Sequence, residues 1–352
     1  MTAMPDAELV AGSLQDDARF ATDTPAIVSE NLAKTYSEGL IFRKKFQALS
    51  GVSFTVNQGE IFGLLGPNGA GKTTFIKVML GIIKKSGGRA TMMGHPAGSK
   101  QCRQSVGYLP ERLRIPPHLT AYQALEYFGN LSNVPTSVVK SKRDEYLELV
   151  GLTGRENDLV KKFSKGMVQR LGLAQALLHD PKMVILDEPT DGLDPRARAE
   201  MRSIIGNLAD RGVTIFLNSH LLQEVEMICQ RVAILDKGNL RYCGPVANIG
   251  EYLSQAAESS QGGKLVRFEV LGDATALNSG FSGSDFKVIS NDGGVATVEA
   301  KVQAQEDVDR IVDSLRKNGV SITGIETRRV SLEDAFLQLT ETDPATDSTD
   351  SR

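Results

Sequence analysis

Short apolar runs alternate with amphipathic stretches along most of the chain. IFGLL (61–65), MVILD (183–187) and TIFLNS (214–219) are almost continuously apolar, which is typical of parallel strands that are covered on both faces. Between about residues 118 and 180 the apolar positions recur with helical spacing, as in AYQALEYFGNL and QRLGLAQALL. Strands that alternate with helices predict an α/β architecture.

Two other patterns lie on either side of this core. AIVSENLA and GVSFTV, within about residues 27–60, predict a β-rich N-terminal part. Beyond residue 263 four short β-type runs accompany one helix with an apolar face, EDVDRIVDSLRKNG, and a closing helix, SLEDAFLQLT. This second pattern predicts a small α+β domain of the ferredoxin-like type.

These changes of pattern suggest domain boundaries. Residues 26–253 form the larger predicted domain, the Ser/Gly/Gln-rich stretch 254–263 is a linker, and 264–340 form the α+β domain. The polar, small-residue segments 1–25 and 341–352 are predicted to be disordered.

Composition narrows the functional classes. The 352 residues are 41% hydrophobic and 24% charged with a net charge of −3, so the chain is an ordinary globular one and no nucleic-acid partner is expected. Its three cysteines are widely spaced without a CxxC pair, which favours a reducing cytosol over a disulfide or zinc framework. Because the chain has neither a signal peptide nor an apolar stretch of about 20 residues, we expect a soluble protein that can still dock on a membrane protein.

The strongest chemical signal follows the first buried strand. GPNGAGKT matches G-x-x-x-x-G-K-[ST] and lies between a predicted strand and a predicted helix, as that phosphate-binding loop requires. Its glycines let the backbone wrap phosphates, the lysine adds a charge and the threonine hydroxyl can ligate Mg²⁺. The loop consists of Gly66, Pro67, Asn68, Gly69, Ala70, Gly71, Lys72 and Thr73.

Two carboxylates follow the second buried strand. Asp187 emerges at the carboxyl end of MVILD, where Mg²⁺ would lie, and Glu188 is suited to polarise an attacking water. His220 follows the next strand, and behind an Asp-Glu pair it is a candidate γ-phosphate contact.

A second anion site is indicated in FSKGMVQR. Ser164 and Gly166 precede a helical run, so they can offer a hydroxyl and backbone N–H groups at a helix start. One chain would then hold two separated phosphate-binding segments.

Together these residues resemble the nucleotide-binding domain of an ATP-binding cassette (ABC) protein. The resemblance covers about residues 27–245 and rests on GPNGAGKTT, YLPE, FSKGMVQR, MVILDEPT, GLD and NSH, in the order of the family. It implies an ABC-type P-loop core with a helical subdomain, an ATPase activity, and ATP and Mg²⁺ as ligands.

The resemblance also assigns roles that the residues alone do not. It implies that two cassettes pack head to tail, so that Ser164 and Gly166 contact the nucleotide held by the partner, and that Asp194 lies at the interface. Thr74 joins the phosphate loop, and Tyr36 falls where the family stacks an aromatic ring on adenine, with Phe42 as the alternative. A second copy of this chain is the expected partner.

Three positions depart from the family pattern. Lys165 and Met167 stand where the signature segment usually has glycine and glutamine, and Glu111 replaces a glutamine that contacts Mg²⁺. A carboxylate can also ligate Mg²⁺, so Glu111 is kept as a ligand. These variants and the ending SLEDAFLQLT resemble the branch that works with ABC-2-type exporters, whose permeases are separate chains.

The expected function is therefore that of an ATPase subunit at the inner face of the cell membrane, held there by a permease that contacts residues 118–160. The alternative is a soluble ABC ATPase that acts on nucleic acid or ribosomes, although such chains generally carry two cassettes, a long coiled coil or zinc cysteines. A P-loop GTPase or small-molecule kinase is a third class, but the sequence has no N-K-x-D. The transported substrate does not follow from the sequence.

Overall fold

The computed structural model describes residues 25–38, 44–249, 252, 264–271, 281, 285–292, 295–302, 305–327, 332, 336 and 340. The predicted disordered ends, the linker and Phe42 lie outside these residues, apart from position 25. The chain divides into two compact units, Met1–Cys243 and Gly244–Arg352, while the predicted boundaries 26–253 and 264–340 stay predictions.

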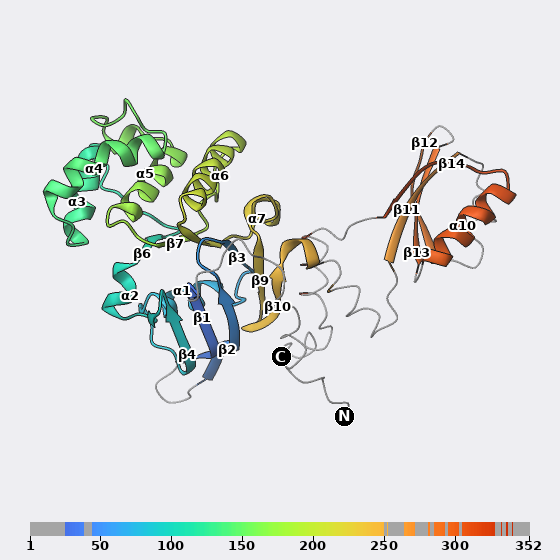
Figure 1. Cartoon of the computed structure of the whole chain (residues 1–352), viewed down its shortest axis with the longest axis horizontal. Coiled ribbons are helices and arrows are strands. Elements are labelled where there is room, and N and C mark those ends of the chain that lie inside the picture. Colours follow the sequence, from blue (N-terminus) through green and yellow to red (C-terminus); the bar gives the residue numbers. More distant parts are fainter. Residues whose placement is uncertain are drawn as a thin grey trace, which may run out of the picture. The chain divides into compact units, whose positions relative to one another are not determined.

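A six-stranded sheet forms the centre of the first unit, in the order β10-β9-β3-β8-β7-β6 (Figure 1). The registers of β9, β3, β8, β7 and β6 are parallel, and every residue of β3, β7 and β8 is buried. The three continuously apolar runs are thus confirmed as central strands. The strands are β3 (Ile61–Leu65), β6 (Val106–Leu109), β7 (Met183–Asp187), β8 (Thr214–Asn218), β9 (Arg231–Asp236) and β10 (Asn239–Pro245).

The β-rich N-terminal part is a second sheet, in the order β2-β1-β4-β5, with antiparallel neighbours. A stack of rings joins it to the central sheet: Phe54 of β2 lies 5.0 Å from Phe75 and 5.4 Å from Phe62, measured between ring centroids. Because Phe62 is on β3 and Phe75 on α1, this core holds the strand and helix on either side of the phosphate loop. The strands are β1 (Ile27–Glu38), β2 (Lys44–Val56), β4 (Gly87–Met92) and β5 (His95–Pro96).

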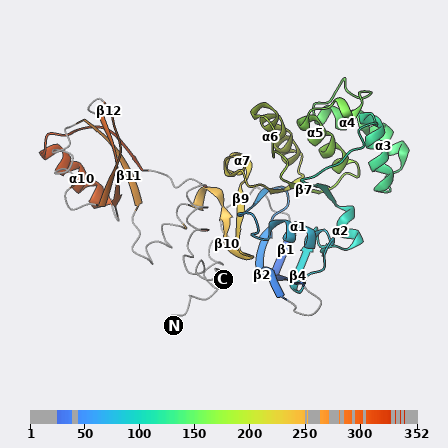
Figure 2. The same ribbon diagram turned by 180° about the vertical axis from the view of Figure 1, so that it is seen from behind.

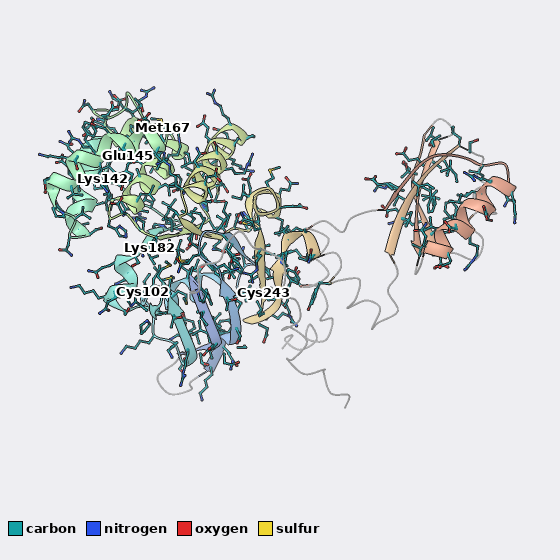
Figure 3. All side chains as sticks on the ribbon, viewed as in Figure 1. Cys102, Lys142, Glu145, Met167, Lys182 and Cys243 are labelled. Carbon is teal, nitrogen blue, oxygen red and sulfur yellow. The ribbon has the colours of Figure 1, made fainter. Side chains whose placement is uncertain are left out.

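The helices α3, α4 and α5 pack on one another and form a helical part that both views place away from β1, β2 and β4 (Figures 1 and 2). In Figure 3, Lys142 and Glu145 of α4 and Met167 of α5 lie in this part. No helix in the described part of the chain has the length and apolar character that a membrane crossing needs. The helices are α1 (Lys72–Met79), α2 (Lys100–Gln104), α3 (Ala121–Leu131), α4 (Thr136–Leu149), α5 (Lys165–Leu177), α6 (Pro195–Asp210) and α7 (Leu222–Ile228), with short 3₁₀ turns at Val160–Lys162 and Val246–Asn248.

The second unit is a four-stranded antiparallel sheet with the order β12-β13-β11-β14. One helix, α10, packs Ile311 and Leu315 into its core, as the sequence predicts. This strand order, with a helix between β13 and β14, is that of the ferredoxin-like fold. The bounds are β11 (Lys264–Leu271), β12 (Asp285–Asp292), β13 (Val295–Val302), α10 (Gln305–Lys317) and β14 (Ser321–Thr327). Most of the predicted closing helix lies outside the described residues.

All three cysteines belong to the first unit and are free. Cys102 and Cys229 are buried and Cys243 is half-buried, and burial raises the pKa of the Cys243 thiol to about 11. Figure 3 shows Cys102 and Cys243 well separated.

Candidate functional site

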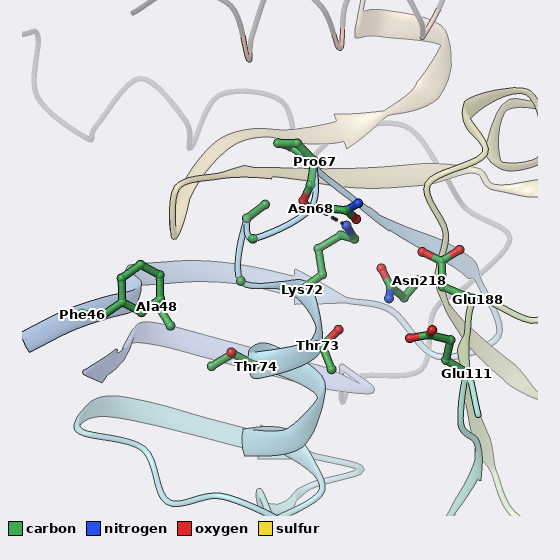
Figure 4. Close-up of a pocket in the computed structure, with 13 residues that line it drawn as sticks. Phe46, Ala48, Pro67, Asn68, Lys72, Thr73, Thr74, Glu111, Glu188 and Asn218 are labelled. Carbon is green, nitrogen blue, oxygen red and sulfur yellow. Dashed lines mark hydrogen bonds between the residues drawn. The ribbon is translucent and has the colours of Figure 1, made fainter. Parts of the chain in front are cut away.

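A cavity of about 240 Å³ opens where β3 ends and the chain turns into α1 (Figure 4). It collects side chains that are distant in sequence, from the second strand to the end of β8. The lining residues are Phe46, Ala48, Pro67, Asn68, Gly69, Ala70, Gly71, Lys72, Thr73, Thr74, Glu111, Glu188 and Asn218. The structure thus brings most of the predicted phosphate loop together with two of the predicted carboxylates.

The glycines of the loop have the backbone geometry that only glycine adopts readily. Gly66 and Gly71 have φ angles of 155° and 105°, and a Cβ on either would lie 2.4 Å from a carbonyl oxygen, of Leu235 and Ala48 respectively. A Cβ on Gly69 would meet nothing within 4 Å, although its φ of 83° also favours glycine. The loop is therefore tightly packed on its inner side and open on the side of the cavity, where a phosphate can approach the backbone.

Lys72 supplies the positive charge of the loop. Its Nζ donates to the carbonyl oxygens of Gly66 at 2.6 Å and Pro67 at 3.2 Å, a contact visible in Figure 4. Burial lowers the pKa of Lys72, and the carboxylates of Glu188 and Asp187 oppose that shift. A buried ammonium next to open backbone amides is suited to an anionic group such as a phosphate.

Asp187 ends β7 beneath the cavity and is 3% exposed. Its carboxylate accepts from Asn218 Nδ2 at 2.5 Å and from the Tyr108 hydroxyl at 3.3 Å, while burial raises the pKa of the group. Asn218 Oδ1 is buried without a hydrogen-bond partner. This side of the cavity therefore has unused oxygen ligands of the kind that a hard cation takes.

The oxygen atoms of these side chains would supply only some of the ligands that Mg²⁺ needs. Thr73 and Glu111 line the cavity beside Asn218, but the described residues contain no group of three or more His, Cys, Asp or Glu side chains that could hold a metal ion. A magnesium ion here would need further oxygens from phosphate or water, which is how Mg²⁺ is usually bound.

Glu188 and His220 form a contact pair at the rim of the cavity. Glu188 has a φ of 53°, and its N–H donates to the Asn218 carbonyl at 2.8 Å, which turns its side chain away from that of Asp187. Glu188 Oε2 accepts from the His220 N–H at 3.2 Å and lies 2.7 Å from His220 Nδ1. Burial raises the pKa of Glu188, and the contacts with His220 lower it.

Ser164, Gly166 and Asp194 lie outside this cavity, at two adjoining helix starts. Ser164 caps α5 by accepting from the Met167 N–H at 3.2 Å, and Asp194 caps α6 by accepting from the Ala197 N–H at 2.8 Å. A Cβ on Gly166 would lie 3.0 Å from Ala197 Cβ. The two segments thus adjoin one another, with Ser164 and Asp194 exposed and Gly166 buried.

The aromatic residue at the cavity is one that sequence reasoning missed. Phe46 lines the cavity and is 58% exposed, whereas Tyr36 is half-buried and is not among the lining residues, with Lys34 Nζ 4.8 Å from its ring centroid. Tyr36 and Phe46 are direct partners across β1 and β2, so their rings share a face of the sheet. Sequence reasoning also missed Asn218 and Tyr108, although they are the first residues of the motifs NSH and YLPE.

The first unit is similar in sequence to proteins of a known family. The family model "ABC transporter" matches residues 49–191. An uncharacterised ABC transporter ATP-binding protein of Nostoc sp. is 48% identical over 221 residues, which span 62% of this chain and 66% of that protein.

Two relatives have names that refer to a particular compound. The linearmycin resistance ATP-binding protein LnrL of Bacillus subtilis is 31% identical over 89% of this chain and 97% of its own length. The Nod factor export ATP-binding protein I of Rhizobium sp. is 38% identical over 58% of this chain and 68% of its own length.

Solved structures share the fold of the first unit. The CbiO1 protein of Clostridium perfringens, described as part of an ABC transporter complex, superposes with a TM-score of 0.57 at 25% identity over 67% of this chain and 95% of its own. A dimeric ATP-binding cassette in a post-hydrolysis state with ADP and Pi superposes with a TM-score of 0.55 at 22% identity, over 62% of this chain and 98% of its own.

Proposed function

The chain belongs to the family of ABC transporter ATP-binding proteins, a family of ATP-hydrolysing cassettes, and from this membership we propose that two copies of it power a membrane exporter. The observation that carries the proposal is the cavity at the end of β3, which unites the phosphate loop with Glu111, Glu188 and Asn218. The remaining roles follow from the contacts of single side chains.

Nucleotide phosphates bind along the open side of the loop from Gly66 to Thr74. The backbone N–H groups of Gly71, Lys72 and Thr73 and the ammonium of Lys72 hold the negative charge. For this, Lys72 exchanges its bonds with the carbonyls of Gly66 and Pro67 for bonds with phosphate oxygens. A phosphate oxygen carries negative charge and a carbonyl oxygen does not, so the exchange adds attraction between opposite charges to each bond of the ammonium.

Thr73, Asp187 and Glu111 hold the magnesium ion that accompanies the nucleotide. The ion supplies charge neutralisation on the phosphates when it is bound. Thr73 and Glu111 line the cavity directly, and Asp187 is held in place by Asn218 and Tyr108. Three hard oxygen ligands suit Mg²⁺, which also keeps bound water.

Glu188 is the group that accepts a proton from the attacking water, and His220 positions it. The carboxylate reaches the cavity with a 12% exposed side chain, and its raised pKa makes it a better base than an ordinary glutamate. His220 is not among the residues that line the cavity, so a contact of its imidazole with a terminal phosphate stays a prediction.

The surface formed by Ser164, Gly166 and Asp194 contacts the nucleotide and loops of a second copy. It lies outside the cavity of its own chain, and the solved cassette of the same fold is described as dimeric. Adenine stacks on an aromatic ring of the N-terminal sheet. Phe46 is the better placed of the described candidates, and Tyr36 stays the alternative.

Separate permease chains would bring the pair of cassettes to the inner face of the cell membrane. The name of the Nod factor relative refers to export, and that of LnrL to resistance, which supports an exporter. We infer no cargo, because the residues that select one belong to the permease.

Replacement of Lys72 tests the site. Lys72→Ala should abolish ATP hydrolysis and greatly weaken nucleotide binding, because it removes the ammonium that faces the phosphates. Lys77→Ala is the matched control, since Lys77 is an exposed lysine of the same helix. ATPase rates and nucleotide titrations of the purified variants decide the matter, and near-normal hydrolysis by Lys72→Ala would refute the assignment.

A further inference from the structure

The sheet of the second unit has one face that its own helix does not cover. Residues that alternate along β11 and β13 point into the core beneath α10: Val266, Phe268 and Val270, and Ala296, Val298 and Ala300. The residues between them point to the opposite face. Leu271 and Val295 on that face are 41% and 42% exposed, whereas Glu299, two rows further along, is 8% exposed. The face is therefore open at its apolar end and closely packed around its charged row.

Three cross-strand pairs form rows across the middle of this open face. Leu271 pairs with Val295, Glu269 with Thr297 and Arg267 with Glu299. The first row is apolar, the second joins an acceptor to a hydroxyl donor, and the third is an ion pair with 2.9 Å between Arg267 Nη2 and Glu299 Oε1.

The charged row extends over all four strands. Lys287 of β12 pairs with Glu299, and Glu326 of β14 pairs with Arg267. Charges therefore alternate as +, −, +, − from one edge of the sheet to the other. Arg267 Nε is buried and has no hydrogen-bond partner, so this row retains a donor that its own sheet does not satisfy.

We propose that this open face is a contact surface for the same face of a second copy of the chain. Consider a twofold axis parallel to the strands that lies between two stacked sheets, midway between β11 and β13. The axis places β11 of one copy over β13 of the other, with each row over itself. Leu271 then faces Val295, Glu269 faces Thr297 and Arg267 faces Glu299.

The outer charges also match under this axis. Lys287 of one copy faces Glu326 of the other, so every position of the charged row meets the opposite sign. Face-to-face sheets cross at about 30° and lie about 10 Å apart, which keeps the central rows in register. A face that is complementary to itself in apolar, polar and charged rows fits a second copy better than it fits an unrelated partner.

The area of the face predicts a weak contact. Four strands about 4.8 Å apart and eight residues of about 3.4 Å each cover roughly 500 Å² per copy, or about 1,000 Å² in total. That is at the lower limit for a specific interface. The proposal rests on the proposed function, because that function needs two copies of the chain. The contact would keep the two chains near one another when no nucleotide joins the cassettes.

Cysteine cross-linking tests the pairing without nucleotide. Leu271→Cys and Val295→Cys are made in separate full-length chains with different tags, mixed, and treated with a bis-maleimide long enough to span two stacked sheets, because facing Cα atoms there lie beyond the reach of a disulfide. We expect a mixed cross-link, because the two positions face each other across the interface. The matched control is Ile325→Cys with Val295→Cys: Ile325 is 48% exposed but pairs with buried Phe268, and so lies toward the helix side of the sheet.

Cross-linking of the control pair to the same extent, or none for the test pair, would overturn the proposal. The wild-type chain, treated in the same way, gives the background cross-linking of its three natural cysteines.

Sedimentation of the full chain provides the second measurement. Leu271→Asp buries a charge against Val295 of the other copy and should raise the dimer dissociation constant at least about tenfold. Equal dimerisation of this variant and the wild type, or a wild type that stays monomeric at the highest concentration reached, contradicts the proposal. Leu271→Asp should retain ATP hydrolysis, so a failure here is distinct from a failure of the proposed ATPase site, which Lys72→Ala reports.

Discussion

Among single residues, Glu188 has two opposing influences on its charge. Burial raises the pKa of its carboxyl group, and the contacts with His220 lower it. Since the base must be ionised, activity should fall as the pH drops through this raised pKa. His220→Ala removes the side-chain contact, so the acid limb of its ATPase profile should lie at higher pH than that of the wild type.

Single-turnover rates at saturating Mg·ATP measure the shift of this acid limb. The pH range of about 5 to 8 covers the ordinary carboxyl and imidazole pKa values. His118→Ala serves as the control, because His118 is an exposed histidine outside the cavity lining. An acid limb that is the same in His220→Ala and the wild type would show that the histidine does not set the charge of Glu188.

The sequence predicts the residues of the loop well and those around it poorly. A glycine-rich loop between a strand and a helix is a local pattern, so Gly66–Thr73 could be assigned without a fold. Phe46 could not, because it reaches the cavity only through the pairing of β1 with β2, which places it opposite Tyr36. Asn218 is brought to Asp187 by the parallel register of β7 and β8, which the sequence does not state.

At the scale of elements, α6 depends on a well-formed start. Asp194 accepts from the Ala197 N–H at 2.8 Å and Pro195 occupies the first turn. Asp194→Ala should therefore lower the free energy of unfolding of the first unit by about 1 kcal/mol, the usual cost of losing such a cap. Urea denaturation measures it, and Arg196→Ala is the control, because that exposed side chain makes only a surface ion pair with Glu200.

A loss of stability in Arg196→Ala as large as that in Asp194→Ala would mean that the cap is not the cause.

The sequence patterns predict the elements that have either a continuous apolar run or a clear helical repeat. β3, β7 and β8 are continuous apolar runs, and α3 and α10 have clear apolar faces. The helical pattern between about residues 118 and 180 does not mark where α4 begins, since TSVVK (136–140) is largely exposed. α6 was missed, because its buried residues begin only at Met201, although Asp194 and Pro195 are recognised start signals.

At the scale of the whole molecule, nucleotide is expected to join two cassettes. Glu188→Gln should bind Mg·ATP and fail to cleave it, because an amide is a very poor base. Two chains should then stay joined through bonds to charged phosphates, each worth about 1.5–3 kcal/mol. Adding Ser164→Arg should break this dimer without loss of ATP binding to the same chain. The Leu271→Asp background removes the proposed sheet contact from the measurement.

Light scattering at saturating ATP compares the dimerisation of these variants. The control carries Ser137→Arg in place of Ser164→Arg, because Ser137 lies on the exposed first turn of α4. Dimers of the doubly substituted cassette that are as abundant as those of Glu188→Gln alone would show that Ser164 does not contact the nucleotide of the partner.

The contacts of Lys72 with its own loop also have a consequence for proton balance. Lys72 rests on two carbonyl oxygens of its own loop in a buried setting that lowers its pKa. A phosphate beside the ammonium favours the charged form and so raises that pKa again. Nucleotide binding in alkaline solution is therefore coupled to the uptake of a proton, and the heat released on binding will depend on the ionisation enthalpy of the buffer that supplies it.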